Sequence, residues 1–306
     1  MSSEGQTFAG FPFCSNLEDL HADIALIGIP HAVPYDAEKP SHSRNAPGVI
    51  RSESNRYKDD PLAWDFDLNG TLLGESGAKV LDCGDLPVCQ KNAEKNCEII
   101  WGATAAIIKA GAIPVVLGGD DSVPIAVMRA YEGSTPFTVL QLDAHIDWRD
   151  SVGGVRDGYS STIRRASEMK CVKGIVQIGM RGAGSAREVE YADAMEYGAK
   201  LIPAQTVIKN GVNSALEALP KGETCFLTID YDVLDPSIMP AVGAPTPGGL
   251  DYGTLIEIIQ GAAIRNRIAG VCLVEFVPEA DLLNLGAITA MRVAWNVIGS
   301  IARNLK

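Results

Sequence analysis

The chain has 306 residues, of which 46% are hydrophobic, so it is long enough to bury a sizeable core. Its 38 acidic residues outnumber its 26 basic ones, and the formal net charge of −12 argues against a nucleic-acid partner, which would need a basic surface. No composition shift or low-complexity linker divides the sequence, so we expect one domain over residues 1–306.

Seven cysteines stand singly along the chain. Because their number is odd and no CxxC pair occurs, we expect neither a disulfide framework nor a zinc knuckle. The N-terminus lacks the charged-then-apolar layout of a signal peptide, and we judge no apolar stretch long enough to span a bilayer. These features predict a cytoplasmic protein with no membrane partner.

Short apolar runs typical of strands alternate with patterns typical of helices. The expected strands cover residues 22–29, 79–83, 112–117, 137–142, 173–179, 199–202, 224–230 and 268–275. The expected helices cover residues 94–110, 124–131, 161–169, 185–197, 211–218, 252–264 and 286–303, and a polar loop covers about 30–47. This alternation predicts a three-layer α/β/α fold with a mostly parallel central sheet, whose functional groups collect at the carboxyl ends of the strands.

Acidic residues follow three of the expected strands. The run DAHID at residues 143–147 comes directly after one of them. Residues two apart on an extended chain point to the same face, so its acidic and histidine side chains can converge beyond the strand end. The pair Asp230 and Asp232 has the same spacing at a second strand, and Asp120 and Asp121 follow a third.

These strand ends offer five carboxylates and one imidazole as candidate metal ligands: Asp121, Asp143, His145, Asp147, Asp230 and Asp232. The number is too large for a tetrahedral structural zinc and suits two oxygen-preferring divalent ions bridged by shared carboxylates. Two such ions would lower the pKa of a bound water and stabilise the charge that develops as it attacks an electrophilic carbon. A lone aspartate after a strand is more often a helix cap or turn residue, but three acidic strand ends favour the metal site.

At these motifs the chain resembles the ureohydrolases, the family of arginase and agmatinase. DAHID matches the family's DAHxD, and GGDDS at 118–122 matches its GGDHS in all but one place. TIDYDVLDP at 228–236, continuing to PGG at 247–249, matches a third signature, SxDxDxxDPxxxPGTGTPxPGG. Three more segments look like the family's FGPxxIR, QIGIRG and MEVSP: residues 46–51, 177–182 and 275–278. The resemblance covers about residue 24 to the C-terminal helix and is closer to the agmatinase branch than to arginase.

The resemblance implies an arginase-like fold, a trimeric or hexameric homo-oligomer, and hydrolysis of a cationic guanidino or biguanide-type compound to urea, or a urea-like product, and an amine. By position, Asp143 and Asp230 would bridge both metal ions. The remaining ligands would divide between the two ions: Asp121 with Asp147, and His145 with Asp232. Asp147 would also hold the nucleophilic water, and Glu275 would pair with the guanidinium group of the substrate.

Three departures from the family pattern bear on function. Asp121 stands where the family has a histidine; a carboxylate favours harder ions, so we expect two Mn²⁺ ions, with Ni²⁺ as the alternative. Asp157 precedes Gly158 where the family has a histidine that aids proton transfer, so it could act as an acid–base group, bind a cationic substrate, or be a simple turn residue. Ala244 replaces a threonine beside the site.

Two questions stay open at this point. His31 and His42 flank the polar loop, and each could contact the substrate or be a plain surface histidine. The rival to an enzyme is a metal-poor, non-catalytic homologue that pairs with an active relative in a mixed oligomer. Because a scaffold has no physical need for a cluster of like charges, we favour the enzyme.

Overall fold

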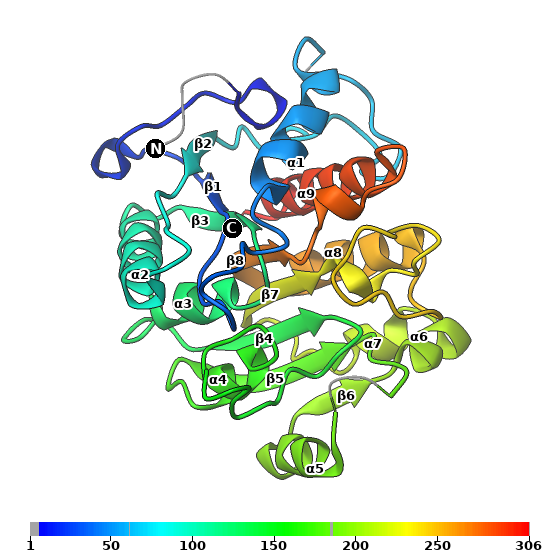
Figure 1. The fold of residues 1–306 in the computed structure, drawn as a ribbon. Helices are drawn as coiled ribbons and strands as arrows, with labels where there is room; N and C mark the ends of the chain where they lie inside the picture. Colours follow the sequence, from blue (N-terminus) through cyan, green and yellow to red (C-terminus); the bar gives the residue numbers. More distant parts are fainter. Residues whose placement is uncertain (1–5, 61, 184–185, 306) are drawn as a thin grey trace.

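The computed structural model describes residues 6–60, 62–183 and 186–305. Within these residues, eight strands form one parallel sheet in the order β2-β1-β3-β8-β7-β4-β5-β6 (Figure 1). The strands are β1 (Ile24–Ile29), β2 (Val80–Asp85), β3 (Ile113–Gly118), β4 (Phe137–Leu142), β5 (Val172–Ile178), β6 (Lys200–Ile202), β7 (Thr224–Asp230) and β8 (Arg267–Val274).

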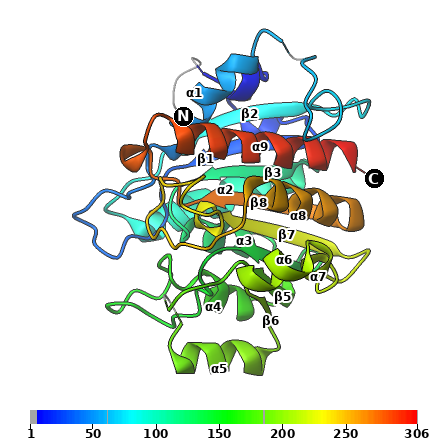
Figure 2. The same ribbon diagram turned by 90° about the vertical axis from the view of Figure 1, so that its right-hand side faces the viewer.

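Helices cover both faces of this sheet, so the predicted three-layer α/β/α fold is confirmed (Figures 1 and 2). One face packs against α2 (Ala93–Lys109), α3 (Val123–Arg129), α4 (Thr162–Ser167) and α5 (Glu188–Tyr197). The other face packs against α1 (Ala46–Ser54), α6 (Ala204–Asn210), α7 (Asn213–Leu216), α8 (Tyr252–Arg265) and α9 (Leu285–Arg303).

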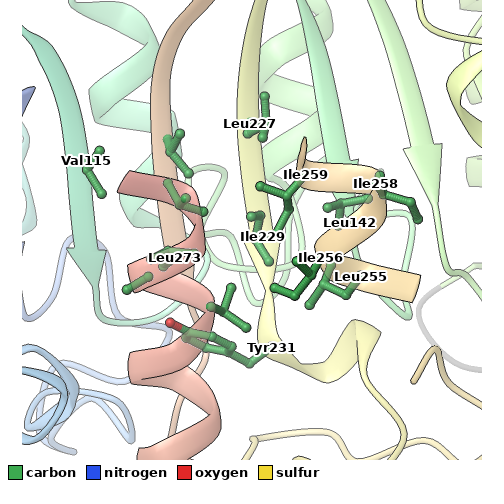
Figure 3. Close-up of a cluster of buried hydrophobic side chains, with 14 of the residues drawn as sticks. Val115, Leu142, Leu227, Ile229, Tyr231, Leu255, Ile256, Ile258, Ile259 and Leu273 are labelled. Carbon is green, nitrogen blue, oxygen red and sulfur yellow. The ribbon is translucent and has the colours of Figure 1, made fainter. Parts of the chain in front are cut away.

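Alternation along the strands builds two hydrophobic cores. In β4, Leu140 and Leu142 belong to the core that includes α8 and α9, whereas Val139 belongs to the core on the opposite face. Figure 3 shows Leu142 together with Ile256 and other buried residues of α8. Because β4 is buried on both faces, four of its six residues are apolar. The other two, Thr138 and Gln141, form hydrogen bonds with polar side chains.

Three helices differ from the sequence-based expectation: α1 and α6 were not predicted, and α7 is shorter than expected. We predicted no helix at α1, whose first turn holds Pro47 and whose last turn is polar; Pro is tolerated there because the first N–H groups of a helix need no intrahelical partner. We expected one helix over 211–218, but Gly211, with φ of 79°, ends α6, and the shorter α7 follows it. The expected start of a helix at residue 185 lies outside the described residues, and α5 begins at Glu188.

The judgement that no apolar stretch is long enough to span a bilayer was wrong for α9. This helix of 19 residues is long and apolar enough by composition to cross a membrane. However, 83% of its apolar window is buried inside the protein, where it packs against α1 and α8. Its apolar character is therefore accounted for by the core. Residues 1–5, on which the signal-peptide judgement depends, lie outside the described residues.

Candidate metal centre and active site

The predicted site residues meet because their strands are neighbours. The order β3-β8-β7-β4 places four carboxyl ends side by side at one edge of the sheet. A cavity of about 520 Å³ opens at this edge. Six of the predicted residues line it: Asp121, His145, Asp147, Asp230, Asp232 and Glu275.

Two groups of three potential ligands share one residue. Ligand atoms of Asp121, Asp143 and Asp147 all lie within 4.8 Å of one another. The same is true of Asp143, His145 and Asp232, so Asp143 belongs to both groups. This is the division that the family resemblance implied for these residues. Asp230 belongs to neither group; it lines the cavity, and its Oδ1 accepts a hydrogen bond of 2.7 Å from the backbone N–H of Asp232.

We expected residues 143–147 to stay extended, so that residues two apart would point to the same face. In the structure this loop after β4 turns instead. Asp147 has φ of 48°, in the left-handed region, and this turn brings its carboxylate back toward Asp143. Glu275, at the end of β8, has φ of 70°. Such conformations cost about 1–3 kcal/mol for a residue other than glycine and are concentrated at functional sites. Both strained residues face the same cavity.

Two buried glutamines, which the sequence reasoning missed, hold the carboxylates in place. Gln141 Nε2 donates hydrogen bonds to Asp143 Oδ2 at 2.7 Å and to Asp147 Oδ2 at 2.8 Å. Gln177 Nε2 in turn donates to Gln141 Oε1, and Gln177 Oε1 accepts from Trp148 Nε1 at 2.8 Å. A glutamine inside a buried apolar strand needs polar partners, which is the signal that could have identified both residues.

The electrostatics of the cluster fit divalent cations. Burial, followed by repulsion between neighbouring carboxylates, raises the pKa of Asp121, Asp143 and Asp230 well above the usual carboxyl range. Both carboxylate oxygens of Asp121 are buried without a hydrogen-bond partner among the described residues. An unpartnered buried carboxylate is costly, and a bound divalent cation would supply the missing partner.

Glu275 lines the same cavity as the metal ligands, beside Asp121, and has two partners. Its Oε1 accepts a hydrogen bond of 2.8 Å from the backbone N–H of Asp121, and its Oε2 lies 2.5 Å from Nε2 of His42. Burial lowers the pKa of His42, but the hydrogen bond and charge of Glu275 outweigh this effect and raise it to about 9. His42 also lines the cavity, a position that is compatible with substrate contact, one of the two possibilities that the sequence left open.

The structure does not bring Asp157 into the cavity. Its carboxylate forms two hydrogen bonds with Arg129, of 2.7 and 3.1 Å, on the surface of α3. The acid–base and substrate-binding roles that we considered for Asp157 do not fit this position. A Cβ at Gly158 would lie 2.0 Å from the ring of Tyr35, so glycine is required there, and the next residue, Tyr159, lines the cavity instead.

His31 and Ala244 complete the set of residues that the sequence singled out. His31 is buried, and its Nδ1 lies 3.0 Å from Asp120 Oδ2 rather than in the cavity. Ala244 lines the cavity, as its position in the motif suggested.

Comparison with known proteins agrees with these observations. The arginase family matches residues 22–299. An agmatinase from Pyrococcus horikoshii is 30% identical over 92% of this chain and 93% of its own length. A mitochondrial guanidino acid hydrolase from Homo sapiens is 28% identical over 92% of this chain and 79% of its own length.

Among solved structures, proclavaminate amidino hydrolase from Streptomyces clavuligerus superimposes with a TM-score of 0.86 and 23% sequence identity. The alignment covers 99% of this chain and 98% of that protein. At this identity the likeness establishes the fold. Together with the family match over most of the sequence, it leads to one conclusion: the chain belongs to the arginase family.

Proposed function

We propose that this chain is a binuclear-metal hydrolase of the C–N bond in a cationic guanidino or biguanide-type compound, with urea, or a urea-like product, and an amine as products. The observation that carries the proposal is the pair of ligand groups that share Asp143 and whose other members line one cavity together with Glu275. Relatives named agmatinase and guanidino acid hydrolase support the same reaction class.

In this proposal Asp143 and Asp230 would hold both ions. Each of the remaining ligands would hold one ion, Asp121 with Asp147 and His145 with Asp232. Two bound divalent ions, Mn²⁺ first and Ni²⁺ second, would supply an acidified water and stabilise negative charge at the reacting carbon.

The chain's own residues then orient the substrate and move the proton. Glu275 pairs with the guanidinium group and turns its central carbon toward the ligand cluster. Asp147 accepts a proton from the attacking water, which adds its oxygen to that carbon. The C–N bond to the leaving group breaks, and the same proton passes to the departing nitrogen. The left-handed backbone at Asp147 and Glu275 supports these two assignments, because strain of this kind marks functional residues.

Metal analysis combined with a substrate screen tests the proposal. We expect about two equivalents of metal per chain after expression with added Mn²⁺, and release of urea or amine from at least one member of a guanidine panel, with Ni²⁺ tested in parallel. A chain that binds no metal under either condition would instead be the non-catalytic subunit of a mixed oligomer. The mutually repelling buried carboxylates favour the enzyme, because without cations they only destabilise the fold.

Assembly into trimers or hexamers, with copies of itself or with a related subunit, is also part of this proposal. Light scattering coupled to size-exclusion chromatography measures the mass of the assembly directly.

A further inference from the structure

The feature that carries a further inference is the ion pair between His42 and Glu275. His42 lies in the loop between β1 and α1, and its Nε2 approaches Glu275 Oε2 to 2.5 Å. The His42 side chain is 35% exposed and the Glu275 side chain 10%, so the imidazole covers the carboxylate on the solvent side. A Cβ at Gly243 would lie 3.1 Å from Glu275 Oε2 and 3.3 Å from His42 Nε2, so the backbone at Gly243 packs closely against the pair.

The loop that carries His42 is anchored to the same strand end as the metal ligands. Ser41 Oγ donates a hydrogen bond of 2.9 Å to Asp120 Oδ2, which also lies 3.0 Å from His31 Nδ1. The His42 ring contacts Tyr159 edge-on, with ring centroids 5.7 Å apart. These contacts on both sides fix the imidazole over Glu275 and distinguish it from a freely rotating surface side chain.

The number of charges around Glu275 limits what can bind beside it. Glu275 supplies one negative charge, and His42, with a pKa of about 9, is already cationic at neutral pH. A carboxylate offers about four lone-pair positions, so Glu275 can still accept a guanidinium from within the cavity. That arrangement places two cations on one carboxylate. A third cation near the imidazole would have no partner and would be repelled.

The mouth of the cavity supplies no compensating charge. Among the described residues, the carboxylates that line the cavity are those of the metal-ligand cluster and Glu275, and the lining contains no lysine or arginine. The uncharged residues of the lining include Tyr159, which contacts His42, and Val242 and Val277. Two further carboxylates act on His42, and neither lines the cavity. Asp120 is buried and has His31 and Ser41 as partners, whereas Glu279 is exposed and accepts a hydrogen bond from Asn45.

We propose that His42 is a specificity-determining residue of this site, which admits guanidines with an uncharged tail and rejects those that carry a second positive charge. The inference rests on the proposed function, since it assigns Glu275 to the guanidinium group. It predicts that this chain discriminates against the tail chemistry of agmatine itself, a guanidine with a terminal ammonium group.

The test compares agmatine with butylguanidine, which has a tail of nearly the same length without the ammonium group. Selectivity is the ratio of kcat/KM for butylguanidine to that for agmatine in the Mn²⁺-loaded protein. The corresponding ratio of affinities is measured by calorimetry on the Mn²⁺-loaded protein at a temperature where turnover is slow, because in the metal-free chain the aspartates of the cluster would attract an ammonium group. The variants are His42→Gln, which removes the charge but can still donate to Glu275, and His21→Gln, which alters an exposed histidine outside the cavity.

We expect the wild type and His21→Gln to favour butylguanidine by at least about tenfold, since like charges this close cost on the order of 1–2 kcal/mol in a protein surface environment. In His42→Gln the ratio should fall to within about threefold of unity. A ratio that is equal in wild type and His42→Gln would overturn the role of His42 while leaving guanidine hydrolysis intact. If two metal ions bind and neither guanidine binds or reacts, the proposed function itself fails.

Discussion

The backbone N–H of Asp121 donates a hydrogen bond of 2.8 Å to Oε1 of Glu275, so the end of β3 holds the carboxylate at the end of β8. The two residues are 154 positions apart in the sequence and become neighbours because β3 and β8 pair in the sheet. Glu275 is thereby fixed relative to the metal-ligand cluster before any substrate arrives, which is the preorganisation that orientation of a reacting group requires.

Glu275→Gln should separate substrate binding from metal binding. The amide keeps the shape of the side chain and an oxygen for the Asp121 N–H, but it loses the charge that would pair with a guanidinium. We expect metal content to stay the same and KM for guanidines to rise at least about tenfold, since hydrogen bonds to charged groups contribute about 1.5–3 kcal/mol. Elemental analysis and steady-state kinetics on the same preparation measure both quantities. Unchanged kinetics would count against the guanidinium role of Glu275.

Gln141→Met tests the support beneath the metal ligands. Methionine has a similar volume but no N–H to donate to Asp143 and Asp147. Loss of a hydrogen-bonded supporting residue typically weakens metal affinity by about 10–100-fold, and we expect a change of this size in a Mn²⁺ titration. Thr138→Val is the matched control, because Thr138 lies at the far end of the same buried strand. Equal affinities in the two variants would show that Gln141 only fills space.

Most of the fold and of the ligand set follow from the sequence, because both depend on short patterns. Short apolar runs define most of the strands, and a parallel sheet collects the residues after its strands at one edge. The resemblance then assigned Asp143 and its neighbours to two ions, and their grouping in the structure agrees for all of the proposed ligands except Asp230.

The rest depends on loops, whose path no local pattern determines. The position of His42 follows from how residues 30–45 cross the sheet edge, and that of Asp157 follows from the partner it finds in Arg129. A polar residue in a loop is equally compatible with a site and with the surface. The left-handed turn at Asp147 was also hidden, because aspartate can adopt either backbone conformation and the surrounding contacts decide between them.

Asp157→Asn should affect stability slightly and catalysis hardly at all. The substitution weakens a partly exposed ion pair with Arg129, and such pairs contribute about 0.2–1 kcal/mol. We therefore expect a small decrease in the free energy of unfolding, measured by urea titration, together with unchanged kcat/KM. A loss of activity of a hundredfold or more, of the size expected for a general acid or base, would restore Asp157 to the catalytic machinery.

The stabilisation by metal should increase with pH. In the metal-free chain, burial and then neighbouring carboxylates raise the pKa of Asp143 and Asp230. A folded-state pKa above the unfolded value gives stability that is present below the unfolded pKa and is lost as pH rises through the raised value. We expect the Tm gain on adding Mn²⁺ to be larger at about pH 8 than at about pH 6, since the ligands must be deprotonated to bind. A gain that falls with pH would contradict this account of the cluster.

Asp121→His should preserve the metal site while changing its metal preference. Both oxygens of Asp121 are buried and free of hydrogen bonds among the described residues, so no hydrogen bond of the side chain is lost when the carboxylate is replaced. An imidazole is a softer donor than a carboxylate, and we expect bound metal to shift from Mn²⁺ toward Ni²⁺ or Zn²⁺ when the ions compete. Asp121→Asn is the control, because its amide has the same shape and is a much poorer ligand. Competition followed by elemental analysis should then give about two ions per chain for Asp121→His and about one for Asp121→Asn. If Asp121→His loses metal to the same extent as Asp121→Asn, the site requires the carboxylate at this position, and the aspartate is a specific feature of this chain's chemistry.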